Sequence, residues 1–178
     1  LERETYVQRN GLAYEYLTNE EQDVEQEIKS TDVDSEDVSK LLAGIIKDDI
    51  TRVLSARHEP TGRDFKYELR IDESSYSRPH TLAVHYITSA LGQPREVVLA
   101  QSMGRDELRV MLADDARMYQ DLRLLVQTDK YIRLRAGSSL TDSQSHILDS
   151  KKQQNSKRRK ELTARVKQAI NNAELIIG

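Results

Sequence analysis

The stretch ELRVMLA at residues 107–113 predicts the strand around which the rest of the fold is arranged. From Leu108 to Ala113 the apolar side chains fall on both faces of an extended chain and only Arg109 adds a partly polar position, so we expect a strand largely buried on both sides. Asp114 and Asp115 end the strand and can accept hydrogen bonds from the free N–H groups of a following helix. That helix carries an apolar stripe suited to packing on a sheet, formed by Met118, Tyr119, Leu122, Leu125 and Val126.

Length and composition limit the chain to one or two small domains. It has 178 residues, 32% of them charged and 37% hydrophobic, which is polar but too patterned for disorder. It has no cysteine, which excludes disulfides and thiolate metal sites and favours a reducing, cytoplasmic location. No apolar run reaches the roughly 20 residues of a membrane span, so we expect no membrane partner. Because the chain begins at Leu1 in a strand-like pattern, we expect an internal fragment of a longer protein.

Charge is distributed unevenly along the chain. Residues 1–50 carry 5 basic and 14 acidic residues, a net charge of −9, which leaves 22 basic and 16 acidic residues, a net charge of +6, for residues 51–178. Only the second part could face a nucleic acid favourably.

A hairpin and two helices are predicted for residues 1–58. Asn10-Gly11 between two alternating segments is typical of a tight hairpin turn. Thr18-Asn19-Glu20-Glu21 matches a capping box and begins a helix that we expect to end near Ser30. The pattern fits either the wing of a winged-helix domain or an ordinary hairpin packed on a helix. Asp34-Ser35 begins a second helix, which should end before the breaker cluster at 59–62.

An α+β sheet domain is predicted for residues 63–136. We expect a mixed four-stranded sheet covered by the helix after Asp115, with strands at 65–71, 81–89, 96–101 and 107–113. Because the first three strands follow one another without helical crossovers, antiparallel pairing is favoured over a doubly wound sheet.

A long basic helix is predicted for residues 138–178. Thr141-Asp142-Ser143-Gln144 is a second capping box, and a helix over 142–177 would be on the order of 54 Å long. It has no apolar residue between Asp149 and Glu161, so its polar middle should stand away from the body or bend. Six cations there are candidate contacts for double-stranded DNA or an acidic partner: Lys151, Lys152, Lys157, Arg158, Arg159 and Lys160. No aromatic residue is interleaved, so stacking on single strands is not indicated, and a solvated helix face explains the cluster equally well.

We expect no catalytic, metal or cofactor site in this chain. The four histidines lack ligand spacing, and the acids at 32–37 lack the glycine and the twelfth-position acid of a calcium loop. There is no Gly-rich phosphate cradle and no nucleophile elbow. A metal-dependent nuclease using Asp72 or Asp114 is the remaining enzymatic hypothesis, although acids at helix starts and strand ends are commonplace.

Several stretches together resemble the large P-loop proteins of BREX phage-resistance systems, the BrxC/PglY family. They are LAYEYLTNEEQ at 12–22 continuing to Ile28, the run from Asp121 to Arg133, ILDSKK at 147–152, and Arg158-Arg159. The resemblance implies an internal segment of a cytoplasmic bacterial defence protein that acts with other subunits against phage. Family members bind ATP through motifs elsewhere in the protein, so it implies no nucleotide-binding residue here. We therefore expect a non-catalytic structural or interaction module, with DNA binding through the basic helix as the alternative.

Overall fold

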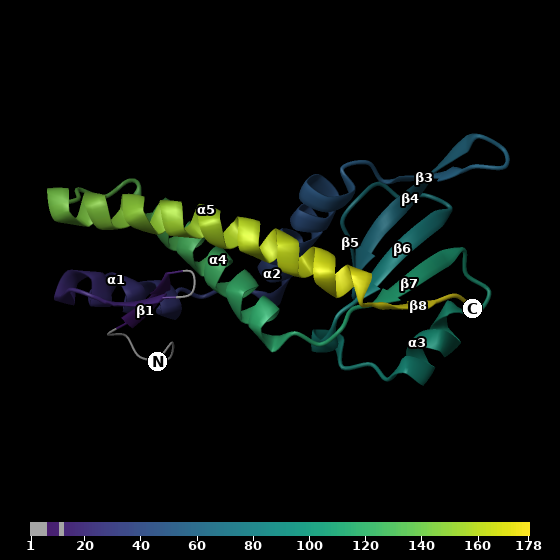
Figure 1. Ribbon diagram of the computed structural model, residues 1–178, viewed down its shortest axis with the longest axis horizontal. Coiled ribbons are helices and arrows are strands. Elements are labelled where there is room, and N and C mark those ends of the chain that lie inside the picture. Colours follow the sequence, from purple (N-terminus) through teal and green to yellow (C-terminus); the bar gives the residue numbers. More distant parts are fainter. Residues whose placement is uncertain (1–6, 11–12) are drawn as a thin grey trace. The chain divides into compact units, whose positions relative to one another are not determined.

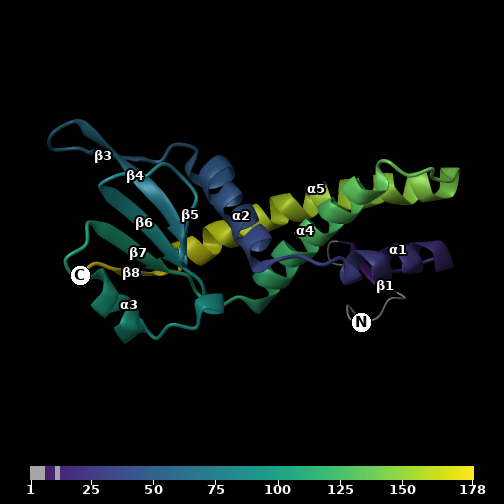
Figure 2. The same cartoon turned by 180° about the vertical axis from the view of Figure 1, so that it is seen from behind.

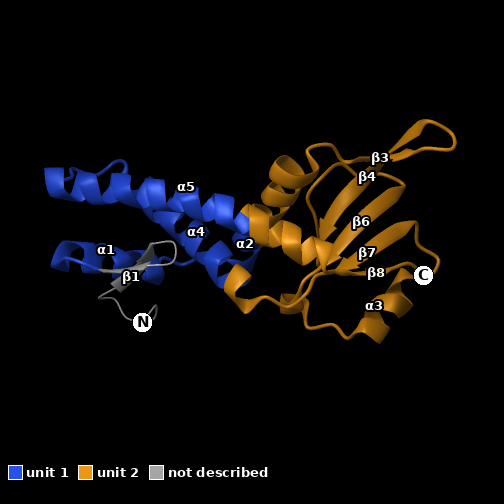
Figure 3. Cartoon of the chain, viewed as in Figure 1, with its two compact units in different colours: residues 1–38, 119–162 blue, residues 39–118, 163–178 orange. Residues whose placement is uncertain are grey.

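The computed structural model describes residues 7–10 and 13–178, which form an α+β fold (Figure 1). The chain divides into two compact units, each built from segments far apart in sequence (Figure 3). Unit 1 comprises residues 1–38 and 119–162, and unit 2 comprises 39–118 and 163–178, whereas the domains predicted from the sequence are consecutive ranges. The five α-helices of the described part are α1 (Asn19–Ser30), α2 (Ser35–Gly44), α3 (Arg95–Ser102), α4 (Ala116–Arg135) and α5 (Asp142–Asn171).

Unit 1 begins with the predicted hairpin. Strands β1 (Val7–Asn10) and β2 (Ala13–Tyr16) pair antiparallel, with Asn10 opposite Ala13, while Gly11 of the predicted turn lies outside the described residues. The hairpin is confirmed, and a winged-helix domain is not.

The capping box at the start of α1 is also confirmed. The backbone N–H of Thr18 donates to Glu21 Oε2 at 2.8 Å, and the Glu21 N–H donates to Thr18 Oγ1 at 3.3 Å. At the other end of the helix, the Gln127 side-chain amide donates to the carbonyls of Lys29 and Thr31. Both ends of α1 are therefore held by side chains, which satisfy backbone groups that a helix leaves unpaired. The apolar core beneath it comes from α1, α4 and α5: Val24, Ile28, Tyr131, Ile147 and Leu148.

Unit 2 is built on a six-stranded mixed sheet instead of the four strands expected. The order is β3-β4-β6-β7-β8, with β5 paired to β4 outside that path. The two central pairings, β4 with β6 and β6 with β7, are parallel, so the expectation of antiparallel pairing is wrong. The strands are β3 (Ser55–His58), β4 (Arg63–Ile71), β5 (Ser74–Ser75), β6 (Leu82–Ile87), β7 (Glu107–Met111) and β8 (Glu174–Ile176).

The segment predicted as a strand at 96–101 is the helix α3. Val98 and Ser102, four residues apart, are both fully buried, which is the period of a helix and not of a strand. The helix connects β6 to β7 and so supplies the crossover that a parallel pair requires. It packs against the sheet through a small apolar cluster whose buried members are Ile87, Val98 and Ile176.

The second helix ends earlier than predicted. After α2 the chain continues as a π-helical segment, Ile45–Thr51, and leaves it at Arg52, whose φ is 61°. Val53, the next apolar residue after Ile50, is 67% exposed. Ser55–His58 instead pair with β4 as β3, and this hairpin extends beyond the other strands of unit 2 (Figure 2). Pairing with the next strand along the chain outweighed the local helical pattern.

The last helix also ends earlier than predicted. α5 stops at Asn171, and β8 adds antiparallel to β7 with Ile176 only 2% exposed and Ile177 72% exposed. The backbone pairing, with Arg109 opposite Ile176 and Met111 opposite Glu174, makes this segment a strand. The helix after β7 is confirmed as α4, which Asp115 caps by accepting from the Met118 N–H at 3.0 Å. Its residues from Tyr119 onward belong to unit 1, while the sheet belongs to unit 2.

Candidate functional site

The six cations in the middle of α5 do not form one face. Lys151 is only 5% exposed, Arg158 and Arg159 are half-buried, and the other three lysines are exposed. With 3.6 residues per turn, positions 151 and 158 lie on one side of the helix, while 157 and 160 lie on other sides. The six cations lie close together in the sequence, but the fold divides them between the interior of unit 1 and its surface.

Lys151 forms a buried ion pair with α1. Its Nζ lies 2.6 Å from Glu25 Oε2, and Glu25 is itself only 8% exposed. Burial alone would raise the pKa of Glu25, but the charge and hydrogen bond of Lys151 outweigh it, with help from Lys29 and Arg158, so the pKa lies below its usual value. One side of the polar middle of α5 is thus packed inside unit 1, whereas the sequence led us to expect that this segment stands away from the body or bends.

The same inward side of α5 carries Asn155. Its Nδ2 donates to the Leu125 carbonyl at 3.0 Å and to Asp129 Oδ1 at 2.7 Å, both on α4. Arg158 Nη1 in turn donates to Asn155 Oδ1 at 2.6 Å. Positions 151, 155 and 158 repeat at helical spacing, so this part of the interface is a polar stripe with its hydrogen bonds made inside the protein.

A pocket opens between α1, α4 and the start of α5, entirely within unit 1. Its volume is about 160 Å³, and the residues that line it are Glu20, Asp23, Val24, Glu27, Tyr131, Arg135, Leu140, Gln144 and Leu148. The apolar members belong to the core of unit 1 or pack against it. The acidic members all come from α1, and this combination gives the pocket an apolar floor and an acidic rim.

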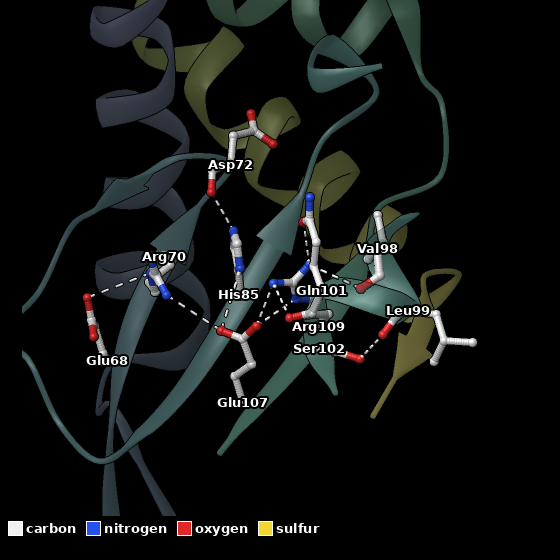
Figure 4. Close-up of polar contacts among 10 residues, drawn as sticks. All are labelled: Glu68, Arg70, Asp72, His85, Val98, Leu99, Gln101, Ser102, Glu107 and Arg109. Carbon is white, nitrogen blue, oxygen red and sulfur yellow. Dashed lines mark hydrogen bonds and ion pairs between the residues drawn. The ribbon is translucent and has the colours of Figure 1, made fainter. Parts of the chain in front are cut away.

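In unit 2, charged side chains converge on one face of the sheet (Figure 4). Arg109, only 2% exposed, binds Glu107 at 2.6 Å and also donates to the carbonyls of Val98 and Gln101 and to the Gln101 side chain. Arg70 approaches the other oxygen of Glu107 at 3.5 Å. The network holds α3 against β7 and centres on the Glu107 carboxylate.

His85 lies between these groups on β6 and is 7% exposed. Its Nε2 bonds to the Asp72 carbonyl, while its Nδ1 is buried without a hydrogen-bond partner, 3.9 Å from Glu107 Oε2. Burial lowers the pKa of His85 and outweighs the opposing effects of the Asp72 carbonyl and Glu107. The Nε2–H donates to the carbonyl in the neutral ring, which leaves Nδ1 as an acceptor facing a carboxylate.

Of the two acids considered for a nuclease, Asp72 and Asp114, the first has structural contacts. The Asp72 carboxylate accepts from the Thr88 N–H at 2.8 Å and from its hydroxyl at 2.7 Å, which ties the end of β4 to the end of β6. Asp115 caps α4, and Asp114 is exposed beside it. Within residues 7–10 and 13–178, no group of three or more acids or histidines could hold a metal ion.

The pocket and the Glu107 network were not found from the sequence. Glu20, Asp23 and Glu27 share one face of α1, a spacing that was visible, but the residues completing the pocket come from segments more than 100 positions away. The signal for the sheet network was the pair of charged residues, Glu107 and Arg109, in an otherwise apolar strand.

No helix in the described part of the chain is long and apolar enough to cross a membrane.

Comparison with protein families gives a match over most of the chain. Residues 31–178 match the model of the fourth domain, with a six-stranded β-sheet, of the BREX ATP-binding protein BrxC. The six strands found in unit 2 agree with that description. No solved structure matches the chain. The resemblance noted in the sequence is therefore confirmed, and the chain belongs to the BrxC family of BREX phage-defence proteins.

Proposed function

We propose that this chain is a non-catalytic interaction module of a BrxC-type protein in the bacterial cytoplasm. Its role is to join the ATP-binding region of the parent protein to other subunits of the BREX defence system. ATP binding and any ATP hydrolysis belong to other parts of the parent protein, and the chain itself uses no cofactor.

The observation that carries this proposal is how the buried charges are used. Lys151 pairs with Glu25 between two helices, and Arg109 pairs with Glu107 between a strand and α3. Such pairs orient one element against another at a desolvation cost, and they suit a platform whose surface has a defined shape. A catalytic site would instead leave titratable groups facing a substrate.

The proposal is tested in the intact BREX protein. Charge-reversal variants of exposed residues are made in both units, and co-purification of the other BREX subunits and ATP hydrolysis are measured together. We expect the variants of at least one surface to abolish co-purification. Their rate of ATP hydrolysis should stay within about twofold of the wild-type rate, which corresponds to roughly 0.4 kcal/mol in the barrier. Loss of hydrolysis in a fully assembled complex, or assembly unaffected by every variant, would contradict the proposal.

A second candidate function, DNA binding, is favoured by the exposure of Lys152, Lys157 and Lys160 on α5. Reversing these three charges should abolish salt-sensitive DNA retention if α5 contacts phosphates. Reversing three exposed cations outside α5 (Lys47, Lys66 and Arg105) provides a control with the same change in net charge. Equal retention by both variants removes α5 as the contact.

A metal-dependent nuclease remains the third alternative. It requires magnesium-dependent cleavage of DNA that is lost in Asp72→Asn or Asp114→Asn. The Asp72 carboxylate already accepts hydrogen bonds from Thr88. Asp72→Asn should therefore lower the stability of the fold whether or not Asp72 takes part in a reaction.

A further inference from the structure

The pocket of unit 1 has the charge and shape of a receptor for one cationic side chain. Its floor is apolar, with Val24, Tyr131 and Leu148 in the core beneath it and Leu140 packed against that core. A volume of about 160 Å³ corresponds to roughly five water molecules at about 30 Å³ each. It is thus large enough for one extended side chain and too small for a folded element.

The charges around the pocket leave its rim negative. Three carboxylates line it, Glu20, Asp23 and Glu27, against one cation, Arg135, a net charge of −2. Arg135 lies 2.5 Å from Glu27, which also accepts from the Tyr131 hydroxyl at 2.6 Å. These two hydrogen bonds, that of Tyr131 first, lower the pKa of Glu27. Glu27 is therefore compensated within the protein, and the remaining negative charge lies at Glu20 and Asp23.

Arg135 shows how the pocket accommodates a guanidinium group. Its Cζ lies 5.4 Å from the centre of the Tyr131 ring, within cation–π range, while its nitrogen binds Glu27. One arginine side chain is thus already held here by an aromatic ring and a carboxylate. Asp23 and Glu20 lie one and two turns earlier on the same face of α1, where a second cation would meet the same kind of surface.

We propose that this pocket binds a lysine or arginine side chain presented by a partner polypeptide. The alkyl stem lies over Val24 and Leu148, and the cationic end reaches Asp23 and Glu20. A long basic side chain has this division into apolar stem and charged tip, whereas an anion would be repelled by the rim. The proposal rests on the function proposed above and adds the chemistry of the partner.

The first test uses the 178-residue chain and small probes. Backbone amide NMR shifts are followed during titration with N-acetyl-arginine amide, N-acetyl-lysine amide and the uncharged N-acetyl-norleucine amide. We expect the two cationic probes to shift Asp23, Val24 and Leu148, with at least fivefold weaker binding of norleucine amide. Equal binding of all three, or shifts at other residues only, would overturn the proposal.

A matched pair of variants separates the pocket from general charge. Glu20→Gln with Asp23→Asn removes the two rim charges that no cation within the pocket compensates, although Glu20 accepts from the Ser143 hydroxyl. Asp32→Asn with Glu36→Gln removes the same charges from exposed positions of unit 1 outside the pocket. Arginine amide should bind at least fivefold more weakly to the first variant and unchanged to the second. Equal weakening in both would show that only net charge matters and would overturn the proposal.

The second test separates this proposal from the broader one. The Glu20/Asp23 variant is introduced into the intact BREX protein, and co-purification of the other subunits is measured. Loss of co-purification together with weaker probe binding supports both proposals. Probe binding confined to another surface, with assembly lost through variants elsewhere, refutes the pocket and leaves the interaction function standing.

Discussion

The two units each bury a glutamate against a cation, but they do so in different ways. In unit 1, Glu25 and Lys151 are 126 residues apart and join α1 to α5 through one ammonium group. In unit 2, Glu107 and Arg109 are two residues apart on β7, and the guanidinium group continues to Val98 and Gln101. The Glu25–Lys151 pair therefore joins two segments that are far apart in the sequence. The Glu107–Arg109 pair instead orients the Arg109 side chain toward the neighbouring helix α3.

This difference follows from the geometry of the two cations. A guanidinium group has five donors in a fixed plane and can satisfy a carboxylate and several carbonyl groups together, whereas an ammonium group acts as a compact point charge. Removing Arg109 therefore leaves several buried acceptors unpaired. Removing Lys151 leaves one carboxylate, with Lys29 still 3.6 Å away. The following variants test this contrast, from the largest expected effect to the smallest.

Arg109→Met should cause the largest loss of stability. Glu107 would keep only the more distant Arg70, at 3.5 Å, and the acceptors on α3 would remain buried without their donor, which together costs about 3–5 kcal/mol in the free energy of unfolding. Urea denaturation followed by circular dichroism measures it. Arg105→Met, at an exposed position, serves as the control. A loss below about 1 kcal/mol for Arg109→Met would show that the hydrogen bonds of its guanidinium group contribute little to stability.

Lys151→Met should cost less, about 2–3 kcal/mol, because Lys29 continues to compensate Glu25. The adjacent and exposed Lys152→Met is the matched control and should change stability by less than about 0.5 kcal/mol. Similar losses for the two variants would show that the buried Lys151 contributes no more to stability than the exposed Lys152.

The contribution of this pair should also depend on pH. The pKa of Glu25 is lowered in the folded chain, so its stabilising effect is present above 4.5, the unfolded value, and is lost as the pH falls through the folded pKa. Wild type and Lys151→Met should therefore differ most at neutral pH and converge in acid. A difference that is constant from pH 7 to pH 3 would contradict a charge-based contact.

His85 should provide a smaller test, in unit 2 and in a higher pH range. Its pKa lies below 6.5 in the folded chain, so the unfolded chain binds a proton first as the pH falls, and wild-type stability should decline from about pH 7 downward. His85→Gln should remove that component of the decline, with the exposed His80→Gln as control. An unchanged pH profile in His85→Gln would show that this imidazole does not couple to folding.

The helix caps should give the smallest effects. Thr18→Ala and Thr141→Ala each remove a capping hydroxyl and should cost about 1 kcal/mol. Thr→Ser at the same positions keeps the hydroxyl and should restore most of the loss in thermal unfolding. If serine and alanine behave alike, the loss comes from side-chain packing and not from the cap.

Local features of the fold could be predicted from the sequence. The capping boxes at Thr18 and Thr141, the strand at 107–113 and the helix after Asp115 depend on residues a few positions apart. Their hydrogen bonds or packing period are encoded in those few residues, so the prediction needs no partner from elsewhere in the chain.

Features that depend on distant segments could not be predicted in this way. The run 96–101 is too short for its period to separate a strand from a helix, and β8 exists because β7 offers an open edge. Lys151 belonged to a basic cluster in the sequence, and only α1, 126 residues away, shows that it is internal. The pocket could not be predicted for the same reason, because Tyr131 and Leu148 complete a site whose acidic residues lie on the distant helix α1.

The central claim is that the polar middle of α5 serves as an internal contact of an interaction platform. A double-mutant cycle with Glu25→Leu, Lys151→Met and the combined variant measures it most directly through the coupling energy of the two side chains. We predict a coupling of at least about 1.5 kcal/mol, with the double variant close to wild type in stability. A coupling near zero would contradict this claim, because Lys151 would then behave like an exposed cation of the basic helix.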